Sequence, residues 1–144
     1  MPHLYIVRGL PGSGKSTYSK TKLGHIKHHY EADMFFERDG RYEFTSALIG
    51  AAHDWCFGNV VKALFDGHDV VVSNTFTANW EMEKYLGLAA PMGDLRFTVI
   101  EMQTQFQNTH NVPQAALDRM KRRWEELPAE WLRGARIAVT RVTE

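Results

Sequence analysis

Short apolar runs alternate with longer amphipathic stretches along most of the chain. We expect strands at residues 3–8, 28–31, 69–73 and 96–102, and helices at residues 16–23, 46–65, 79–86 and 114–126. The run Val70-Val71-Val72 shows no polar alternation, which is typical of a strand covered on both faces of a parallel sheet. Strands that alternate with helices predict an α/β fold in three layers, a mainly parallel sheet flanked by helices.

Turn and cap signals divide these elements. Asp39-Gly40 predicts a turn, and we expect Thr77 or Asn79 to cap the helix at 79–86. Pro128 interrupts the helix before it. Residues 136–142 alternate apolar and polar side chains, which predicts a late strand at an edge of the sheet.

Composition and charge narrow the class of protein. The 144 residues carry 17 Lys or Arg and 17 Asp or Glu, which argues against a strongly basic surface for coating nucleic acid but leaves room for a local basic groove. Cys56 is the only cysteine, which favours a reducing, cytoplasmic setting. There is no signal-peptide pattern and no apolar run near the ~20 residues that cross a bilayer, so we expect no membrane partner. We expect residues 1–144 to form a single domain, of an oligomeric state that the sequence leaves open.

The most specific motif follows the first strand. Residues 9–17 read Gly-Leu-Pro-Gly-Ser-Gly-Lys-Ser-Thr and match G-x-x-x-x-G-K-[ST], the phosphate loop, between a strand and a helix. Such a loop directs backbone N–H groups at phosphate oxygens, and the helix adds the positive end of its dipole. We expect Lys15 to reach the β- and γ-phosphates of ATP as a catalytic residue and Ser16 to ligate Mg²⁺. The predicted nucleotide-binding residues are Pro11, Gly12, Ser13, Gly14, Lys15, Ser16 and Thr17.

Two further candidates lie at the carboxyl ends of neighbouring strands, where open α/β sheets bind ligands. Asp33 follows the second strand, where a carboxylate accepts the proton of an attacking hydroxyl or places Mg²⁺ through water. A turn or helix-capping aspartate is the alternative. Asn74 stands where many phosphate-loop proteins carry a metal-orienting aspartate, and its carboxamide either orients a hydroxyl or phosphate or only ends the strand. We take Asp33 and Asn74 as candidate catalytic residues.

Residues 103–126 occupy the position of a lid over the phosphates. The candidates there are His110, Arg119 and Arg122, because a lid arginine stabilises charge in the transition state of phosphoryl transfer. Arg119 and Arg122 are spaced as neighbours on a helix surface. The alternative is a solvated helix face with the glutamates at 125–126 as partners, which we favour for most of the basic residues here.

Further segments carry a resemblance to a known family. They are residues 30–36 (Tyr-Glu-Ala-Asp-Met-Phe-Phe), 52–56 (Ala-His-Asp-Trp-Cys), 70–77 with 80–82, and 108–113 (Asn-Thr-His-Asn-Val-Pro). With the phosphate loop they resemble small phage and bacterial phosphate-loop ATP-binding proteins, AAA or zeta-toxin-like kinases. That family is related to the 5′-hydroxyl kinase domain of phage polynucleotide kinase. The resemblance runs from about Leu4 to Glu126.

The resemblance implies a role for Asp33 and marks three departures. In the polynucleotide kinases an aspartate at the position of Asp33 contacts the 5′-hydroxyl as general base. Phe36 stands where those kinases have a substrate-binding arginine, and Gln107 where their lid supplies an arginine. Asn74 replaces the first aspartate of a run that ends their third strand. The departures affect acceptor handling more than ATP binding.

The combined interpretation is an ATP- and Mg²⁺-dependent kinase that transfers the γ-phosphate to a hydroxyl of a nucleic-acid 5′-end or a nucleoside-like acceptor. A nucleotide-binding interaction module with little catalysis is one alternative, since Asn74 and Gln107 replace charged partners. A small-molecule or nucleoside monophosphate kinase is the other, since the chain and its lid region are short.

Overall fold

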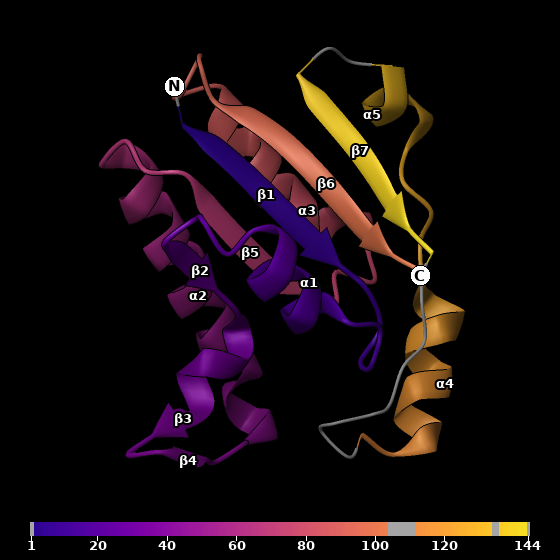
Figure 1. The fold of residues 1–144 in the computed structure, drawn as a ribbon. Helices are drawn as coiled ribbons and strands as arrows, with labels where there is room; N and C mark the ends of the chain where they lie inside the picture. The colour runs from indigo at the N-terminus through magenta and orange to yellow at the C-terminus, as the bar shows by residue number, and fades with distance from the viewer. Residues whose placement is uncertain (1, 104–111, 134–135, 144) are drawn as a thin grey trace.

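A five-stranded parallel sheet forms the centre of the molecule (Figure 1). The computed structural model describes residues 2–103, 112–133 and 136–143. The strands are β1 (His3–Arg8), β2 (His28–Tyr30), β5 (Val70–Asn74), β6 (Arg96–Met102) and β7 (Ile137–Val142), in the order β2-β5-β1-β6-β7. Every neighbouring pair runs parallel. The carboxyl ends of these strands therefore meet at one edge of the sheet.

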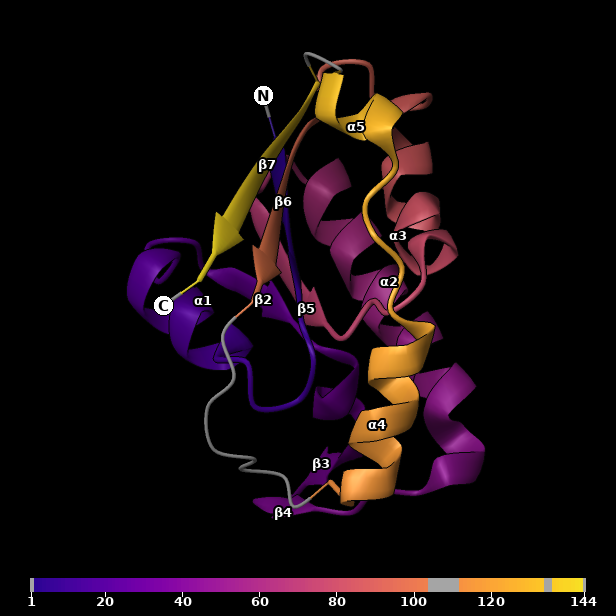
Figure 2. The ribbon, with the colours of Figure 1, turned by 90° about the vertical axis from the view of Figure 1, so that its right-hand side faces the viewer.

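Helices cover both faces of the sheet, which gives the three layers that the sequence predicts. Helices α2 (Ile49–Phe65) and α3 (Asn79–Leu86) pack on one face, and α1 (Lys15–Lys22) packs on the other (Figures 1 and 2). Val70 and Val72 belong to the larger core beneath α2 and α3, and Val71 belongs to the smaller core on the opposite face. The continuous apolar run of β5 is explained by this burial on both sides.

Three segments extend beyond the carboxyl edge of the sheet (Figures 1 and 2). They are the 3₁₀ turn η1 (Ala32–Phe36), a hairpin of β3 (Glu37–Arg38) and β4 (Arg41–Tyr42), and helix α4 (Gln114–Arg123). The hairpin turns at Asp39-Gly40, whose φ values of 51° and 77° are the left-handed backbone that this pair adopts readily. These segments and the phosphate loop surround the edge where ligands bind in such sheets.

The fold class and the expected strands are confirmed, with β7 at the edge of the sheet. The helix expected at 114–126 is too long, because α4 ends at Arg123 and a separate helix α5 (Ala129–Arg133) follows Pro128. The first turn of the long helix is a separate 3₁₀ turn, η2 (Ser46–Leu48), and another, η3 (Gly87–Ala89), follows α3. No helix in the described part of the chain is long and apolar enough to cross a membrane.

The expected cap of α3 is also wrong. Ala78, and neither Thr77 nor Asn79, is the residue before the helix. The Glu81 carboxylate accepts the Ala78 N–H at 2.9 Å, and the Thr77 hydroxyl donates to the same carboxylate at 3.2 Å. A side chain within the first turn therefore satisfies the helix start in place of a capping hydroxyl or carboxamide.

Candidate functional site

The phosphate loop joins the end of β1 to the start of α1, and its glycines stand where side chains do not fit. Gly12 and Gly14 have φ values of 82° and 90°, which residues with a Cβ rarely adopt. A Cβ on Gly9 would lie 2.4 Å from Ser13 Oγ and 2.9 Å from the Cβ of Met102. The loop thus turns tightly at the start of α1. The residue before this helix, Gly14, has no side chain to cap the first N–H groups, which is the arrangement that binds anions at a helix start.

Lys15 folds back onto the loop that precedes it. Its Nζ donates to the carbonyl oxygens of Gly9 at 2.8 Å and Leu10 at 3.1 Å. Burial lowers the pKa of Lys15 to about 8, although the carboxylates of Glu31 and Asp33 oppose that shift. The ammonium group is therefore held at the phosphate loop with neutral acceptors, close to two carboxylates.

Ser16 meets a carboxylate that the sequence analysis did not select. Its hydroxyl donates to Glu31, with distances of 3.3 Å and 3.5 Å to the two carboxylate oxygens, and His29 Nε2 lies 3.2 Å from Glu31 Oε2. Glu31 directly follows β2 and stands two residues before Asp33. A search for oxygen ligands at the strand end would have included Glu31 with Asp33.

Asp33 lies in η1, exposed to solvent at the edge of the sheet. The Tyr42 hydroxyl, from the hairpin, donates to Asp33 Oδ1 at 3.1 Å. Burial and the neighbouring Asp33 carboxylate raise the pKa of Tyr42 to about 12, so Tyr42 remains a donor at neutral pH. The hairpin thus orients the Asp33 carboxylate, and no other described residue donates a hydrogen bond to its second oxygen.

Asn74 is buried at the end of β5 and supports the turn that carries Asp33. Its Oδ1 accepts the Ala32 N–H at 2.9 Å, and its Nδ2 lies 3.8 Å from Cys56 Sγ. The side chain joins the end of β5 to the start of η1. Asn74 therefore lies next to the predicted site but acts on its backbone.

Arg8, the last residue of β1, is completely buried and joins three segments. It pairs with Glu101 of β6 at 3.1 Å and donates to the carbonyl oxygens of Phe76 and Glu125 at 2.7 Å and 3.0 Å. Its guanidinium carbon lies 3.7 Å from the centre of the Trp124 ring. This contact fixes the chain that leaves α4 against the carboxyl end of the sheet.

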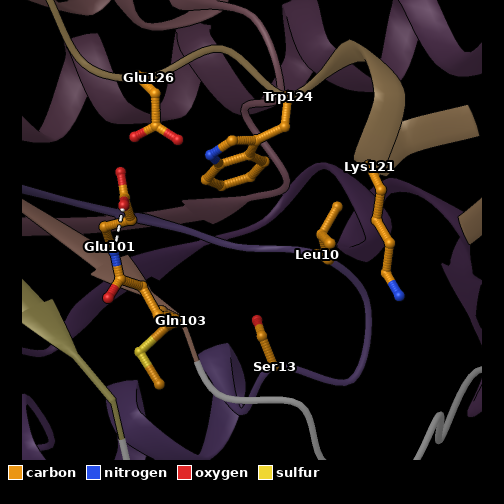
Figure 3. A pocket seen from close by; sticks show the side chains of 8 residues that line it. Leu10, Ser13, Glu101, Gln103, Lys121, Trp124 and Glu126 are labelled. Carbon is orange, nitrogen blue, oxygen red and sulfur yellow. Dashed lines mark hydrogen bonds between the residues drawn. The ribbon is translucent and has the colours of Figure 1, made fainter. Parts of the chain in front are cut away.

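A cavity of about 310 Å³ opens beside the phosphate loop (Figure 3). Leu10 and Ser13 enter it from the phosphate loop, Glu101 and Gln103 from the end of β6, and Lys121, Trp124 and Glu126 from α4 and the segment after it. Met102 completes the lining. The cavity therefore lies between the phosphate loop and both ends of the predicted lid region.

The lid candidates have different outcomes. His110, together with Gln107, lies outside the described residues. Arg119 and Arg122 are exposed on α4, and neither lines the Figure 3 cavity. Lys121 of the same helix does line it. Within the described residues, the cations of α4 form no ion pair with the glutamates at 125–126.

The oxygen donors near the phosphate loop fit a Mg²⁺ ion that is bound by the protein and by nucleotide phosphates together. No group of three or more His, Cys, Asp or Glu side chains that could hold a metal ion is found among residues 2–103, 112–133 and 136–143. Mg²⁺ bound with a nucleotide needs fewer protein ligands, because waters and phosphate oxygens complete its octahedron. The Ser16 hydroxyl and the Glu31 carboxylate are adjacent oxygen donors that meet this requirement.

Relatives that match by sequence include a human and a bacterial protein. NEDD4-binding protein 2 from Homo sapiens is 34% identical over 93 residues, which cover 60% of this chain and 5% of that protein. An uncharacterized protein from Pasteurella multocida is 33% identical over 127 residues, which cover 78% of this chain and 70% of that protein. The chain thus spans only a small part of the human relative and most of the bacterial one.

Solved structures share the fold. A kinase candidate from Chloroflexus aurantiacus has a TM-score of 0.63 at 16% identity, covering 99% of this chain and 89% of that chain. Kti12 from Chaetomium thermophilum, in complex with ADP-AlF3, has a TM-score of 0.61 at 13% identity, covering 96% and 88%. A gluconokinase from Sinorhizobium meliloti has a TM-score of 0.59 at 18% identity, covering 99% and 84%.

The family comparison covers the phosphate loop, the carboxyl edge of the sheet and α4. Residues 4–127 match the family described as "AAA domain". That range contains β1, the loop with Lys15 and Ser16, and the turn with Asp33. With the sheet order and the kinase-like structural neighbours, this match establishes that the chain belongs to the AAA domain family and has the fold of phosphate-loop kinases.

Proposed function

We propose that this protein is an ATP-dependent kinase that transfers the γ-phosphate of ATP to a hydroxyl group of a nucleic-acid 5′-end or a nucleoside-like acceptor. The observation that carries the proposal is the cluster at the ends of β1 and β2. There the Ser16 hydroxyl contacts Glu31 at 3.3 Å, and the Glu31 and Asp33 carboxylates both act on the pKa of Lys15. A phosphate loop, a place for Mg²⁺ and a carboxylate for the acceptor are the parts that phosphoryl transfer needs.

The phosphate loop holds the nucleotide in this proposal. Backbone N–H groups of residues 12–17 and the Lys15 ammonium group bind the β- and γ-phosphates. Lys15 exchanges the neutral carbonyl oxygens of Gly9 and Leu10 for anionic phosphate oxygens, which are stronger acceptors. Ser16 and Glu31 would hold Mg²⁺, which when bound neutralises charge on the β- and γ-phosphates.

Asp33 handles the acceptor in this proposal. The acceptor hydroxyl oxygen forms a bond to the γ-phosphorus, the bond from that phosphorus to the β–γ bridging oxygen breaks, and ADP leaves. The proton of the hydroxyl passes to the second carboxylate oxygen of Asp33. Tyr42 orients Asp33 through its hydrogen bond, and Asn74 positions the turn through the Ala32 N–H.

The direct test compares transfer with nucleotide binding. Purified protein is incubated with γ-labelled ATP, Mg²⁺ and a panel of 5′-hydroxyl oligonucleotides, nucleosides and nucleoside monophosphates. Asp33→Asn is expected to keep ATP affinity and to lower transfer by roughly 10²–10⁴-fold, because it removes a proton acceptor. Lys15→Ala is expected to weaken ATP binding by roughly 10- to 100-fold, because a charge-assisted contact is lost.

A matched control is Asp39→Asn, which removes an exposed carboxylate in the hairpin turn, away from the phosphate loop. It is expected to leave ATP affinity and transfer unchanged. Transfer to no member of the panel contradicts the proposed activity. Undiminished transfer by Asp33→Asn contradicts the proposed role of Asp33 but not the proposed kinase activity.

A nucleotide-binding module with little catalysis is a second candidate, favoured by one observation. The Asn74 carboxamide, at the strand end where a catalytic aspartate is common, is bonded to the backbone of η1. If the function of the protein in a cell survives Asp33→Asn but not Lys15→Ala, nucleotide binding rather than transfer is the activity.

A further inference from the structure

A second hollow, of about 270 Å³, also borders α4 but takes other side chains from it than the Figure 3 cavity does. Thr75, Trp80 and Glu81 line it from the end of β5 and the start of α3, and Met120 and Arg123 line it from α4. The Figure 3 cavity takes Lys121 and Trp124 instead. Neighbouring residues at the end of α4 therefore line two different hollows.

One residue that lines the hollow, Thr75, is hydrogen-bonded to the first residue of the phosphate loop. The carbonyl oxygen of Thr75 accepts the Gly9 N–H at 3.2 Å. Arg8, the residue before Gly9, donates to the Phe76 carbonyl oxygen at 2.7 Å. A ligand in this hollow would consequently lie against a segment that is bonded to the first residue of the loop proposed to hold the phosphates of ATP.

The polar wall of the hollow divides into occupied and available groups. The Glu81 carboxylate already accepts from the Ala78 N–H and the Thr77 hydroxyl. The Trp80 indole is 68% exposed, and Arg123 is exposed and has no ion pair with any carboxylate in the described part of the chain. A planar apolar ring and a free guanidinium beside a hollow are suited to a base and a phosphate, respectively.

The charge of α4 distinguishes between acceptor classes. Residues 114–123 contain four cations and one carboxylate, although the whole chain carries equal numbers of basic and acidic residues. A nucleoside or a sugar alcohol brings no phosphate to this helix. A single strand of nucleic acid brings one per nucleotide, which matches the local charge.

We propose that the hollow between α3 and α4 is the acceptor subsite, and that it holds the first nucleotides of a single-stranded nucleic acid with a 5′-hydroxyl end. Trp80 stacks on a base, and Arg123 pairs with a backbone phosphate. This inference rests on the proposed kinase function and names its substrate class.

The test measures acceptor and nucleotide parameters separately. With a short 5′-hydroxyl oligonucleotide as acceptor, Trp80→Ala is expected to raise the oligonucleotide KM about tenfold, since stacking on an aromatic side chain is lost. Trp80→Phe is expected to retain most of the affinity. Arg123→Gln is expected to raise the oligonucleotide KM several-fold and to reduce its salt dependence. The KM for ATP stays unchanged in all three variants.

Matched controls come from the opposite end of the sheet. Phe65, at the end of α2, is 60% exposed, and Arg133, at the end of α5, is exposed. Both helices end shortly before the start of a strand, far from its carboxyl end. Phe65→Ala and Arg133→Gln are expected to leave the oligonucleotide KM unchanged.

The outcomes separate this inference from the proposed function. An oligonucleotide KM that is unchanged in Trp80→Ala and Arg123→Gln, while transfer proceeds, overturns the subsite and leaves the kinase intact. A second outcome also overturns the inference: Trp80→Ala raises the KM for thymidine or adenosine, and Arg123→Gln changes the KM of no acceptor. The acceptor in the hollow is then a nucleoside and not a nucleic-acid strand. Oligonucleotides of DNA and of RNA in the acceptor panel show which kind of strand is bound.

If no acceptor is phosphorylated, the proposed function fails. Direct binding of an oligonucleotide then tests whether the hollow is a nucleic-acid site. Fluorescence anisotropy of a labelled single-stranded oligonucleotide then measures affinity directly. Weaker binding by Trp80→Ala, with Phe65→Ala unchanged, supports a nucleic-acid site without transfer. Equal binding by both variants, or no binding by the unmodified protein, overturns the hollow as a nucleic-acid site.

Discussion

Arg8 and Arg122 carry the same side chain near the same edge of the sheet, but their surroundings are opposite. Arg8 has no exposed surface, pairs with Glu101, donates to backbone carbonyls and stacks on Trp124. Arg122 is exposed on α4 and has no ion pair within the described residues. Arg8 therefore joins parts of the protein, whereas the cations of α4 remain available to anions from solution. The hydrogen-bond partners of an arginine, and not its distance from the phosphate loop, separate the two roles.

Lys15 stands between these extremes. It is held by two backbone carbonyl oxygens, yet it can exchange both for phosphate oxygens without leaving a carboxylate unpaired. Arg8 has no such freedom, because its departure would take the closest cation from the buried Glu101 carboxylate. The three side chains thus form a series from fixed through exchangeable to free.

Among these three side chains, replacement of Arg8 is expected to have the largest effect on the free energy of unfolding. Arg8→Ala leaves the buried Glu101 carboxylate without its closest cation and removes donors from the Phe76 and Glu125 carbonyl oxygens. Breaking a buried pair in this way costs roughly 3–5 kcal/mol. We expect a loss of that size in the free energy of unfolding, measured by urea denaturation.

The exposed arginine supplies the control for that measurement. Arg122→Ala is expected to change the unfolding free energy by less than about 0.5 kcal/mol. Glu101→Gln is expected to cost less than Arg8→Ala, because Arg8 retains its carbonyl partners. Equal losses in Arg8→Ala and Arg122→Ala would remove the distinction between a fixed and a free arginine.

The lowered pKa of Lys15 predicts that nucleotide affinity depends on pH. The nucleotide-free protein holds the pKa of Lys15 at about 8. ATP is expected to bind through the charged form, so affinity stays constant below pH 8 and falls by about tenfold per pH unit above it. Isothermal titration calorimetry between pH 7 and 9.5 measures this slope. Lys15→Arg stays charged over that range and is expected to lose the slope, whatever its absolute affinity.

The same pKa predicts how stability changes with pH. Between about pH 8 and 10.5 the unfolded chain keeps the Lys15 proton that the folded, nucleotide-free protein releases. The contribution of Lys15 to stability therefore rises with pH in that window. Urea denaturation of the nucleotide-free protein should give a smaller increase over this window for Lys15→Met than for the unmodified protein. Equal slopes in the two proteins would contradict the lowered pKa.

Local sequence signals were sufficient for the sheet and the phosphate loop. Val70-Val71-Val72 reports burial on both faces within three residues, and the phosphate-loop motif is contiguous between β1 and α1. The hairpin offered only its Asp39-Gly40 turn, because strands of two residues are too short to show a period. The end of α4 was missed because Trp124 takes an extended backbone and stacks on Arg8, more than a hundred residues earlier.

The candidate site divides in the same way. Lys15 and Ser16 follow from a contiguous motif, and Asp33 follows from its place after a strand. The contacts that define their surroundings join distant segments: Ser16 to Glu31, Asp33 to Tyr42, and Asn74 to the start of η1. A periodic pattern reports which face of an element is buried but not which side chain of another element meets it. The roles of Asp33, Asn74, Arg119 and Arg122 remain predictions for mutagenesis.

The smallest predicted effect concerns two neighbours on α4. On a helix of 3.6 residues per turn, Lys121 lies about 40° from the buried anchor Leu117, whereas Arg122 lies about 140° from it. Lys121 accordingly lines the cavity beside Leu10, and Arg122 does not. Lys121→Ala is expected to weaken ATP binding by about three- to fivefold, the range of a partly exposed charge contact, and Arg122→Ala by less than about twofold. Calorimetric titration with ATP at low and high salt checks both values. A loss of transfer near 10³-fold in Arg122→Ala, with ATP affinity unchanged, would instead identify Arg122 as the lid arginine of the transition state, because only a group that stabilises transferring charge acts on the rate alone.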